Sequence, residues 1–141
     1  MAKRILILCT GNSCRSQMAE GFLKKFGPEL QVYSAGTHPA KEVNPNSITV
    51  MKEAGIDISS HKPKNIKEFL DQSFDFVITV CDNANEACPV FSGKVKNNLH
   101  ISFIDPADAK GSRENILEEY REVRDEIKSS FRQLYDTRLK E

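Results

Sequence analysis

The fold of this chain is decided by the stretch Cys9-Thr10-Gly11-Asn12-Ser13-Cys14-Arg15-Ser16. It follows an apolar run at residues 5–8 and precedes a helical pattern, so we predict a strand, a short polar loop and a helix N-terminus. The free N–H groups and the positive dipole end of that terminus suit an anion. Because the same surroundings favour a thiolate, Cys9 is the candidate nucleophile.

The rest of the stretch has the residue types of an oxyanion site. The planar guanidinium of Arg15 can hold two oxygens of a tetrahedral oxyanion. Ser16 is expected to stabilise the Cys9 thiolate, to cap the helix, or to do both. No Gly-Lys-Ser/Thr follows, so we do not expect a nucleotide. The predicted oxyanion-binding residues are Thr10, Gly11, Asn12, Ser13, Cys14 and Arg15, with Gly11 allowing close approach and Asn12 tolerating left-handed geometry. The alternative is a buried strand-end cysteine beside a surface arginine.

The composition is that of one globular domain spanning residues 1–141. Hydrophobic residues make up 39% and charged residues 28% of the chain, and the formal net charge is zero. This balance argues against nucleic acid or a membrane surface as a partner, and no apolar run approaches the ~20 residues of a membrane helix. We therefore expect a cytoplasmic protein. Its four cysteines are then better explained by catalysis, redox chemistry or metal binding than by structural disulfides.

Strand and helix patterns alternate along the chain. We expect strands at 4–8, 31–34, 74–80 and 99–104, and helices at 16–26, 45–54, 65–70 and from about 112 to the end. Such alternation predicts an α/β fold with a parallel sheet covered on both faces. In these sheets ligands bind beyond the carboxyl ends of the strands. Cys9, Cys81 and Asp105 each follow a predicted strand, so the fold should bring them to one edge. The last helix has an apolar stripe that we expect to be buried, at Ile116, Tyr120, Val123, Ile127, Phe131 and Leu134.

Cys81 and Cys88 help to distinguish hydrolysis from redox chemistry as the reaction of this protein. A hydrolase does not need them, and their spacing of seven, with no second pair, is poor for zinc. Two buried structural cysteines are one reading, which the position of Cys81 at the end of a core strand fits. Cys88, however, lies in a polar, acidic stretch that is unsuitable for an inert thiol. A segment with a thiol at each end suits stepwise thiol–disulfide exchange.

These motifs carry a family resemblance. Cys-x5-Arg followed by Ser after the first strand resembles the low-molecular-weight protein tyrosine phosphatase superfamily, and CTGNSCRSQMAEG is similar to its thioredoxin-coupled arsenate reductase branch. The likeness extends to residues 33–36, Cys81, Cys88-Pro89 and Asp105-Pro106. It implies a four-stranded parallel sheet in the order 2-1-3-4, flanked by helices on both faces.

The resemblance also implies a function in arsenical resistance. Cys9 would attack arsenate, Cys81 would then attack Cys9 with release of arsenite, and Cys88 would resolve the disulfide for thioredoxin. We expect a monomer that needs no metal and no organic cofactor. The alternatives are a phosphotyrosine or phosphomonoester phosphatase that uses Cys9, Arg15 and Asp105, and a non-enzymatic oxyanion or redox sensor.

Asp105-Pro106 matches the Asp-Pro loop of the superfamily, in which the aspartate protonates the leaving oxygen. The same role is expected for Asp105 toward arsenate, and the alternative is a simple turn. The phosphatases commonly have an aromatic residue after Asp-Pro, whereas this chain has Ala107. This departure argues against an aryl phosphate substrate.

A second departure concerns a monovalent cation that members of the branch can bind beside the Cys loop. Asn12, Glu20 and Ser34 match its ligands, but Lys62-Pro63-Lys64 stands where Thr-x-Asp is expected. We therefore expect no potassium, with the ammonium of Lys62 or Lys64 in its place, unless both lysines are simply solvated. The three histidines show no metal-ligand spacing.

Overall fold

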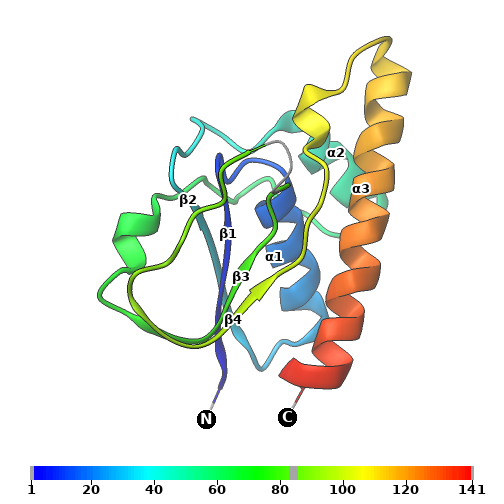
Figure 1. The fold of residues 1–141 in the computed structure, drawn as a ribbon. Helices are drawn as coiled ribbons and strands as arrows, with labels where there is room; N and C mark the ends of the chain where they lie inside the picture. The colour runs from blue at the N-terminus through cyan, green and yellow to red at the C-terminus, as the bar shows by residue number, and fades with distance from the viewer. Residues whose placement is uncertain (1, 83–85, 141) are drawn as a thin grey trace.

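A single sheet of parallel strands organises the chain, in the order β2-β1-β3-β4. In this computed structural model, which describes residues 2–82 and 86–140, the strands are β1 (Arg4–Cys9), β2 (Gln31–Gly36), β3 (Ser73–Thr79) and β4 (Lys94–His100). The predicted strand order is confirmed. The carboxyl ends of the strands lie at the upper edge of the sheet in Figure 1, and both termini lie at the opposite end.

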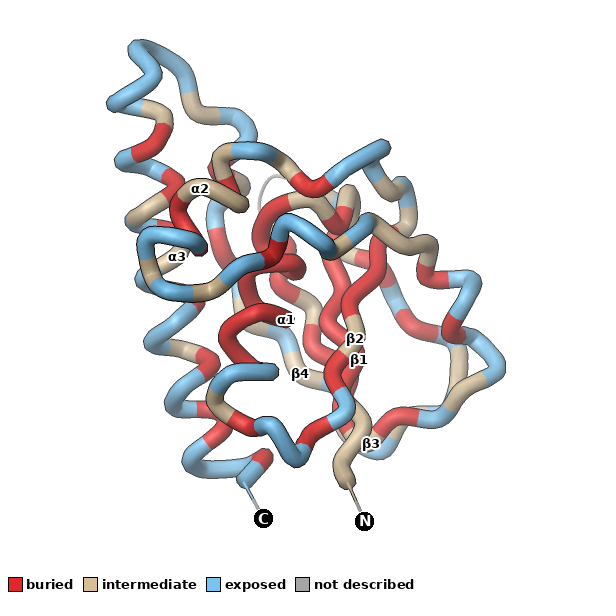
Figure 2. The backbone as a smooth tube through the Cα atoms, turned by 180° about the vertical axis from the view of Figure 1, so that it is seen from behind, coloured by how far each residue is buried: buried red, intermediate tan, exposed pale blue. Residues whose placement is uncertain are grey.

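β1 lies at the centre of the sheet and is buried on both faces. Ile5 and Ile7 pack into one hydrophobic cluster, while Leu6 and Leu8 pack into the other. All four side chains are fully buried, as a continuous apolar run in a parallel sheet requires. Figure 2 shows the buried residues concentrated in β1, β2, β3 and α1.

The cover of the two faces is unequal. The helices α1 (Arg15–Phe26), α2 (Pro45–Glu53) and α3 (Arg113–Leu134) all contribute to the cluster on one face, and the long α3 forms the right side of Figure 1. The other face is covered by the 3-10 helix η1 (Ile66–Phe69) and by Phe91. Helical cover on both faces is therefore present, but on this second face it amounts to one short turn.

The predicted position of the fourth strand was wrong. We expected residues 99–104, whereas β4 runs from Lys94 to His100 and pairs with β3 from Ser73 to Thr79. As the edge strand, β4 is half exposed and tolerates polar residues, so it has no apolar run to mark it. The apolar residues beyond it leave the sheet, and Phe103 enters the main core.

The last helix begins as expected, with the Ser112 hydroxyl accepting from the Asn115 N–H. The predicted stripe is buried except at its first position, where Leu117 is buried and Ile116 only partly so. Asn44 caps α2 as its sequence indicates. In the described ranges no helix is long and apolar enough to span a membrane.

Candidate active site

Cys9 ends β1 with its sulfur turned into the loop that follows. Its Sγ lies 2.9 Å from the Ser16 hydroxyl and accepts from the Asn12 backbone N–H at 3.2 Å. The residue is only 2% exposed. α1 begins at Arg15 with Cys14 as its N-cap residue, so Ser16 is the second helical residue. The capping role considered for Ser16 is therefore wrong, and its hydroxyl instead faces the Cys9 sulfur.

Asn12 braces the loop from within. It has a positive φ of 50°, as its predicted tolerance of left-handed geometry allows. Its amide nitrogen donates to Ser16 Oγ at 2.7 Å and Ser34 Oγ at 2.9 Å, and its amide oxygen accepts from the Lys64 N–H at 2.9 Å. Because Asn12 is completely buried, these bonds fix the loop conformation. At Gly11 an added Cβ would meet only Ser13 Oγ, at 3.6 Å, so the protein itself does not demand glycine there.

The guanidinium of Arg15 points into the same site. Its side chain is 3% exposed, and Nη1 donates to the Phe103 carbonyl at 3.1 Å. Burial opposes the charged form, but the hydrogen bonds that Arg15 donates to Glu86 and the charge of Asp105 prevail and raise the pKa of Arg15. Nε is buried with no partner among residues 2–82 and 86–140. A cavity of about 240 Å³ is lined by residues 9–15 and Asp105. Arg15 is therefore a charged donor held at the wall of an anion-sized cavity.

Glu86 contacts this arginine, which the sequence reasoning missed. Its Oε2 and Oε1 lie 2.7 and 2.8 Å from the two terminal nitrogens of Arg15, and Thr10 Oγ1 donates to Oε1 at 3.1 Å. Burial disfavours the carboxylate, yet the hydrogen bonds and charge of Arg15 lower the pKa of Glu86 below its ordinary value. The signal in the sequence was an acidic residue between Cys81 and Cys88.

Asp105 forms the expected turn and also lies at the loop cavity, where its proposed role as a proton donor stays a prediction. Oδ1 accepts from the Ala107 N–H and so caps the 3-10 turn η2 (Pro106–Asp108). Oδ2 lies 3.5 Å from Arg15 Nη2. The turn therefore holds the carboxyl group against the loop cavity, where it also forms part of the lining.

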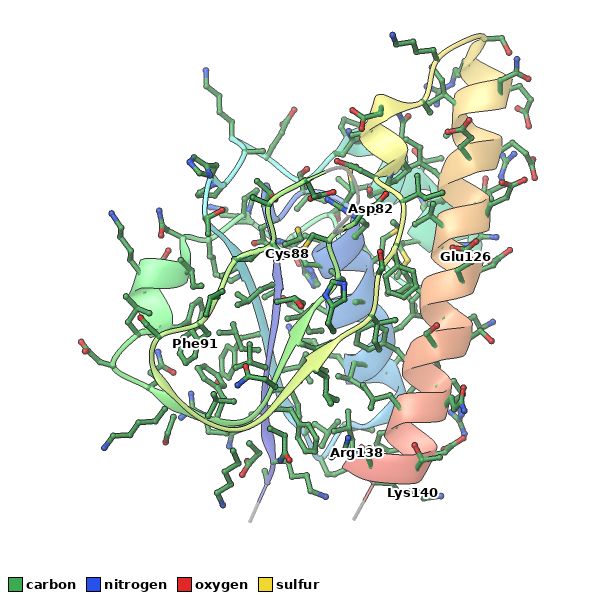
Figure 3. The ribbon with its side chains drawn as sticks, viewed as in Figure 1. Asp82, Cys88, Phe91, Glu126, Arg138 and Lys140 are labelled. Atoms are coloured by element: carbon green, nitrogen blue, oxygen red, sulfur yellow. A yellow bond between two sulfur atoms is a disulfide. The ribbon has the colours of Figure 1, made fainter. Side chains whose placement is uncertain are left out.

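Cys81 and Cys88 form a disulfide with a Cα–Cα distance of 5.8 Å, within the normal range. Cys81 is fully buried, and Cys88 is half-buried near the upper edge of the sheet in Figure 3. β1 and β3 are neighbours, with Leu8 opposite Thr79. Cys9, which ends β1, and Cys81, two residues after the end of β3, therefore lie at the same edge of the sheet. The fold thus brings three cysteines to one end of the sheet.

A ring nitrogen of His100 lies within 4.8 Å of both disulfide sulfurs. In a reduced chain, the two thiolates and the imidazole could hold a soft metal ion. Here the two sulfurs are bonded to each other and offer no thiolate. The cluster therefore has no metal-binding capacity in this form.

Cys14 belongs to the lining of the cavity, but its thiol is buried against neighbouring side chains. Its sulfur lies 3.7 Å from Ser13 Oγ and 3.8 Å from the Tyr120 hydroxyl, and the residue is 3% exposed. Burial is the main reason that the pKa of Cys14 is raised. A thiol in this state is a poor nucleophile.

A buried chain of polar groups runs from the loop to the surface. Ser34 Oγ donates to Glu20 Oε1 at 2.6 Å, and Glu20 Oε2 pairs with Lys24 Nζ at 2.7 Å. The ammonium at Glu20 is thus that of Lys24. Lys64 Nζ instead donates to the Lys62 carbonyl. The lysine paired with Glu20, one of the predicted cation ligands, is therefore Lys24, one helical turn along α1 on the same face. That an ammonium of Lys62 or Lys64 takes the cation's place stays a prediction.

Known proteins that are similar to this chain in sequence and structure belong to the group that the site geometry indicates. The family model described as low molecular weight phosphotyrosine protein phosphatase matches residues 4–141. The chain belongs to this family. Its relatives include an arsenate reductase of Halalkalibacterium halodurans, 47% identical over 136 residues that cover 96% of both chains. An arsenate reductase 2 of Staphylococcus haemolyticus is 50% identical over 131 residues, covering 92% of this chain and 93% of the relative.

Solved structures of the family have the same fold. One described as an arsenate reductase in oxidized state aligns with a TM-score of 0.77 at 30% identity, covering 95% of this chain and 97% of its own. The family resemblance carried by residues 9–16 is thereby confirmed.

Proposed function

We propose that this chain is an arsenate reductase, which converts arsenate to arsenite by a relay of three cysteines. The observation that carries the proposal is the Cys81–Cys88 disulfide at the strand edge where Cys9 ends β1. A phosphatase of this family has no chemical need of that pair. Two relatives that are about half identical over almost their whole length are named arsenate reductases, which supports the same assignment.

In the first step Cys9 binds covalently to arsenic. Arsenate has the tetrahedral shape and charge of phosphate and would be held by the N–H groups of residues 10–15 and by Arg15. The Cys9 thiolate, stabilised by Ser16, attacks arsenic and forms an S–As bond. A hydroxyl of arsenate leaves as water after taking a proton from Asp105, whose carboxyl group lines the cavity.

The following steps transfer two electrons from the thiols to arsenic and remove no further oxygen atom from it. The Cys81 thiolate attacks Cys9 Sγ, the S–As electron pair passes to arsenic, and arsenite leaves. Cys88 then attacks Cys81 Sγ and releases the Cys9 thiolate. Overall, arsenate and two thiols give arsenite, one disulfide and water.

Thioredoxin is the proposed reductant of this last disulfide. Since Cys81 is fully buried and Cys88 half-buried, an external dithiol would attack Cys88 Sγ. This accessibility of one sulfur suits a small dithiol protein as the partner. We propose that the enzyme acts as a monomer in the cytoplasm, where reduced dithiols are available.

Phosphatase activity is the second candidate, because Cys9, Arg15 and Asp105 would serve either reaction. Ala107 is exposed beside Asp105 where an aromatic residue would contact an aryl phosphate, which disfavours a phosphotyrosine substrate. A non-enzymatic sensor would use the same thiols without turnover. A steady-state assay separates the three: arsenate-dependent oxidation of reduced thioredoxin, aryl phosphate hydrolysis, or neither.

The decisive experiment separates the steps of the relay with a stoichiometric arsenate pulse. Cys88→Ser should release one arsenite per protein and leave a Cys9–Cys81 disulfide, identified by peptide mapping. Cys81→Ser should release almost none, because no other thiol is placed to attack arsenylated Cys9. Cys9→Ser should abolish both arsenate reduction and phosphatase activity. Full multiple turnover of Cys88→Ser with thioredoxin would contradict the relay and favour the phosphatase or sensor.

A further inference from the structure

Glu86 accepts hydrogen bonds from both terminal nitrogens of Arg15, which lines the loop cavity. The two carboxylate oxygens form a two-point contact with the fork at 2.7 and 2.8 Å. The Thr10 hydroxyl donates to the same carboxylate. A second carboxylate, that of Asp105, lies 3.5 Å from Nη2. Arg15 is thus held between two negative groups at the wall of the cavity.

This two-point contact is the one that a tetrahedral oxyanion makes with a guanidinium. An oxyanion in the loop cavity that used the terminal nitrogens would compete for the donors that Glu86 occupies. It would also bring a further negative charge beside Glu86, whose side chain is only 20% exposed and therefore poorly screened. Glu86 and a bound oxyanion therefore oppose each other at Arg15.

The disulfide fixes where Glu86 lies. Cys81 is immobilised at the end of β3, where the neighbouring Val80 N–H donates to the Leu8 carbonyl at 2.9 Å. The Glu86 N–H donates to the Asp82 carbonyl at 2.9 Å, and the Asp82 N–H donates to Glu86 Oε2 at 3.3 Å. Cys88, two residues further, is tied to Cys81 by the disulfide. Glu86 is therefore anchored from both sides in the oxidised form, and reduction removes one anchor.

We propose that Glu86 is an internal, redox-dependent ligand of the oxyanion site. In the disulfide form its carboxylate stands in for the substrate at Arg15, and in the dithiol form the oxyanion displaces it. This inference rests on the proposed function in taking Arg15 as the oxyanion clamp. It assigns Glu86 a place in the cycle: the oxidised enzyme rejects a new arsenate until an external dithiol has reduced it.

The proposed coupling between oxyanion binding and the redox state of Cys81 and Cys88 has a second consequence. If the dithiol form binds an oxyanion more tightly than the disulfide form, the oxyanion must favour the dithiol form by the same factor. Bound substrate would thus make the Cys81–Cys88 disulfide easier to reduce. This can be measured without any turnover.

The test uses inorganic phosphate, which has the shape of arsenate but is not reduced by thiols. Its dissociation constant is measured by calorimetry on the disulfide and dithiol forms of the wild type, Glu86→Gln and the matched control Glu126→Gln, an exposed glutamate on α3. We expect the wild-type dithiol form to bind phosphate about tenfold more tightly or better, since two charge-assisted contacts are exchanged. Glu86→Gln should tighten the disulfide form and bring the ratio near one, while Glu126→Gln keeps the wild-type ratio.

Two outcomes overturn the proposal. Weaker phosphate binding by both forms of Glu86→Gln would mean that Glu86 orients Arg15 for the ligand. Equal affinities of the two wild-type forms would mean that the disulfide does not control the site. Equilibration with a thiol buffer provides an independent check, because phosphate should shift the wild type, but not Glu86→Gln, toward the dithiol. Phosphate binding requires no arsenate reduction, so failure here and failure of the relay experiment are distinguishable.

Discussion

Replacing Ser16 by alanine tests whether its hydroxyl stabilises the Cys9 thiolate. The hydroxyl lies 2.9 Å from Cys9 Sγ and is completely buried, so water does not replace it in the folded protein. A hydrogen bond to a charged group contributes about 1.5 to 3 kcal/mol, which corresponds to a factor of about 10 to 150. The loss should not be larger, because the Asn12 N–H remains 3.2 Å from the sulfur.

The assay is alkylation of Cys9 by iodoacetamide at pH 7 on the disulfide form. Cys81 and Cys88 are then protected, and Cys14 is buried with a raised pKa. Ser16→Ala should react about 10- to 150-fold more slowly, because its thiolate has lost a hydrogen-bond donor. Single-turnover release of arsenite should slow by a comparable factor. Ser129→Ala, the same change at an exposed position of α3, serves as the control. Equal alkylation rates of Ser16→Ala and wild type at pH 7 would refute the reasoning.

Three further predictions concern the loop and its surroundings. Arg15→Lys should lower single-turnover arsenate reduction by about 10²- to 10³-fold, since an ammonium lacks the two-point geometry, whereas Arg113→Lys should not; near-normal activity of Arg15→Lys would exclude the clamp. Gly36→Ala should weaken phosphate binding and cost about 1–3 kcal/mol of stability in urea unfolding, because its Cβ would lie 2.4 Å from the Thr10 carbonyl oxygen; an unchanged midpoint would contradict this. Burial, assisted by Lys24 and Lys64 against the pull of Glu20, lowers the pKa of His61 from its ordinary 6.5. The unfolded chain therefore takes up this proton first, and the free energy of unfolding should fall as pH drops below 6.5. His61→Gln should flatten that slope in unfolding curves between pH 7.5 and 5.5, whereas the exposed His38→Gln should leave it intact.

Local patterns of residues are sufficient to predict several elements of this fold. The apolar run at residues 5–8 gave a central buried strand, and the loop at residues 9–16 led directly into α1. The caps at Asn44 and Ser112 bond to backbone N–H groups two and three residues on, so they can be read from short spacings. The family motif supplied the strand order, which spacing alone does not establish.

Contacts between groups that are distant in the sequence depend on the packing of the whole fold. β4 owes its position to pairing with β3, because an edge strand with one exposed face needs no apolar run. Glu86 contacts Arg15 across 71 positions. Ion pairs of this kind depend on side-chain reach and burial, which leave no periodic trace in a sequence. The contact between the Glu86 carboxylate and Arg15 is therefore seen only in the folded structure, where the sheet edge brings the two segments together.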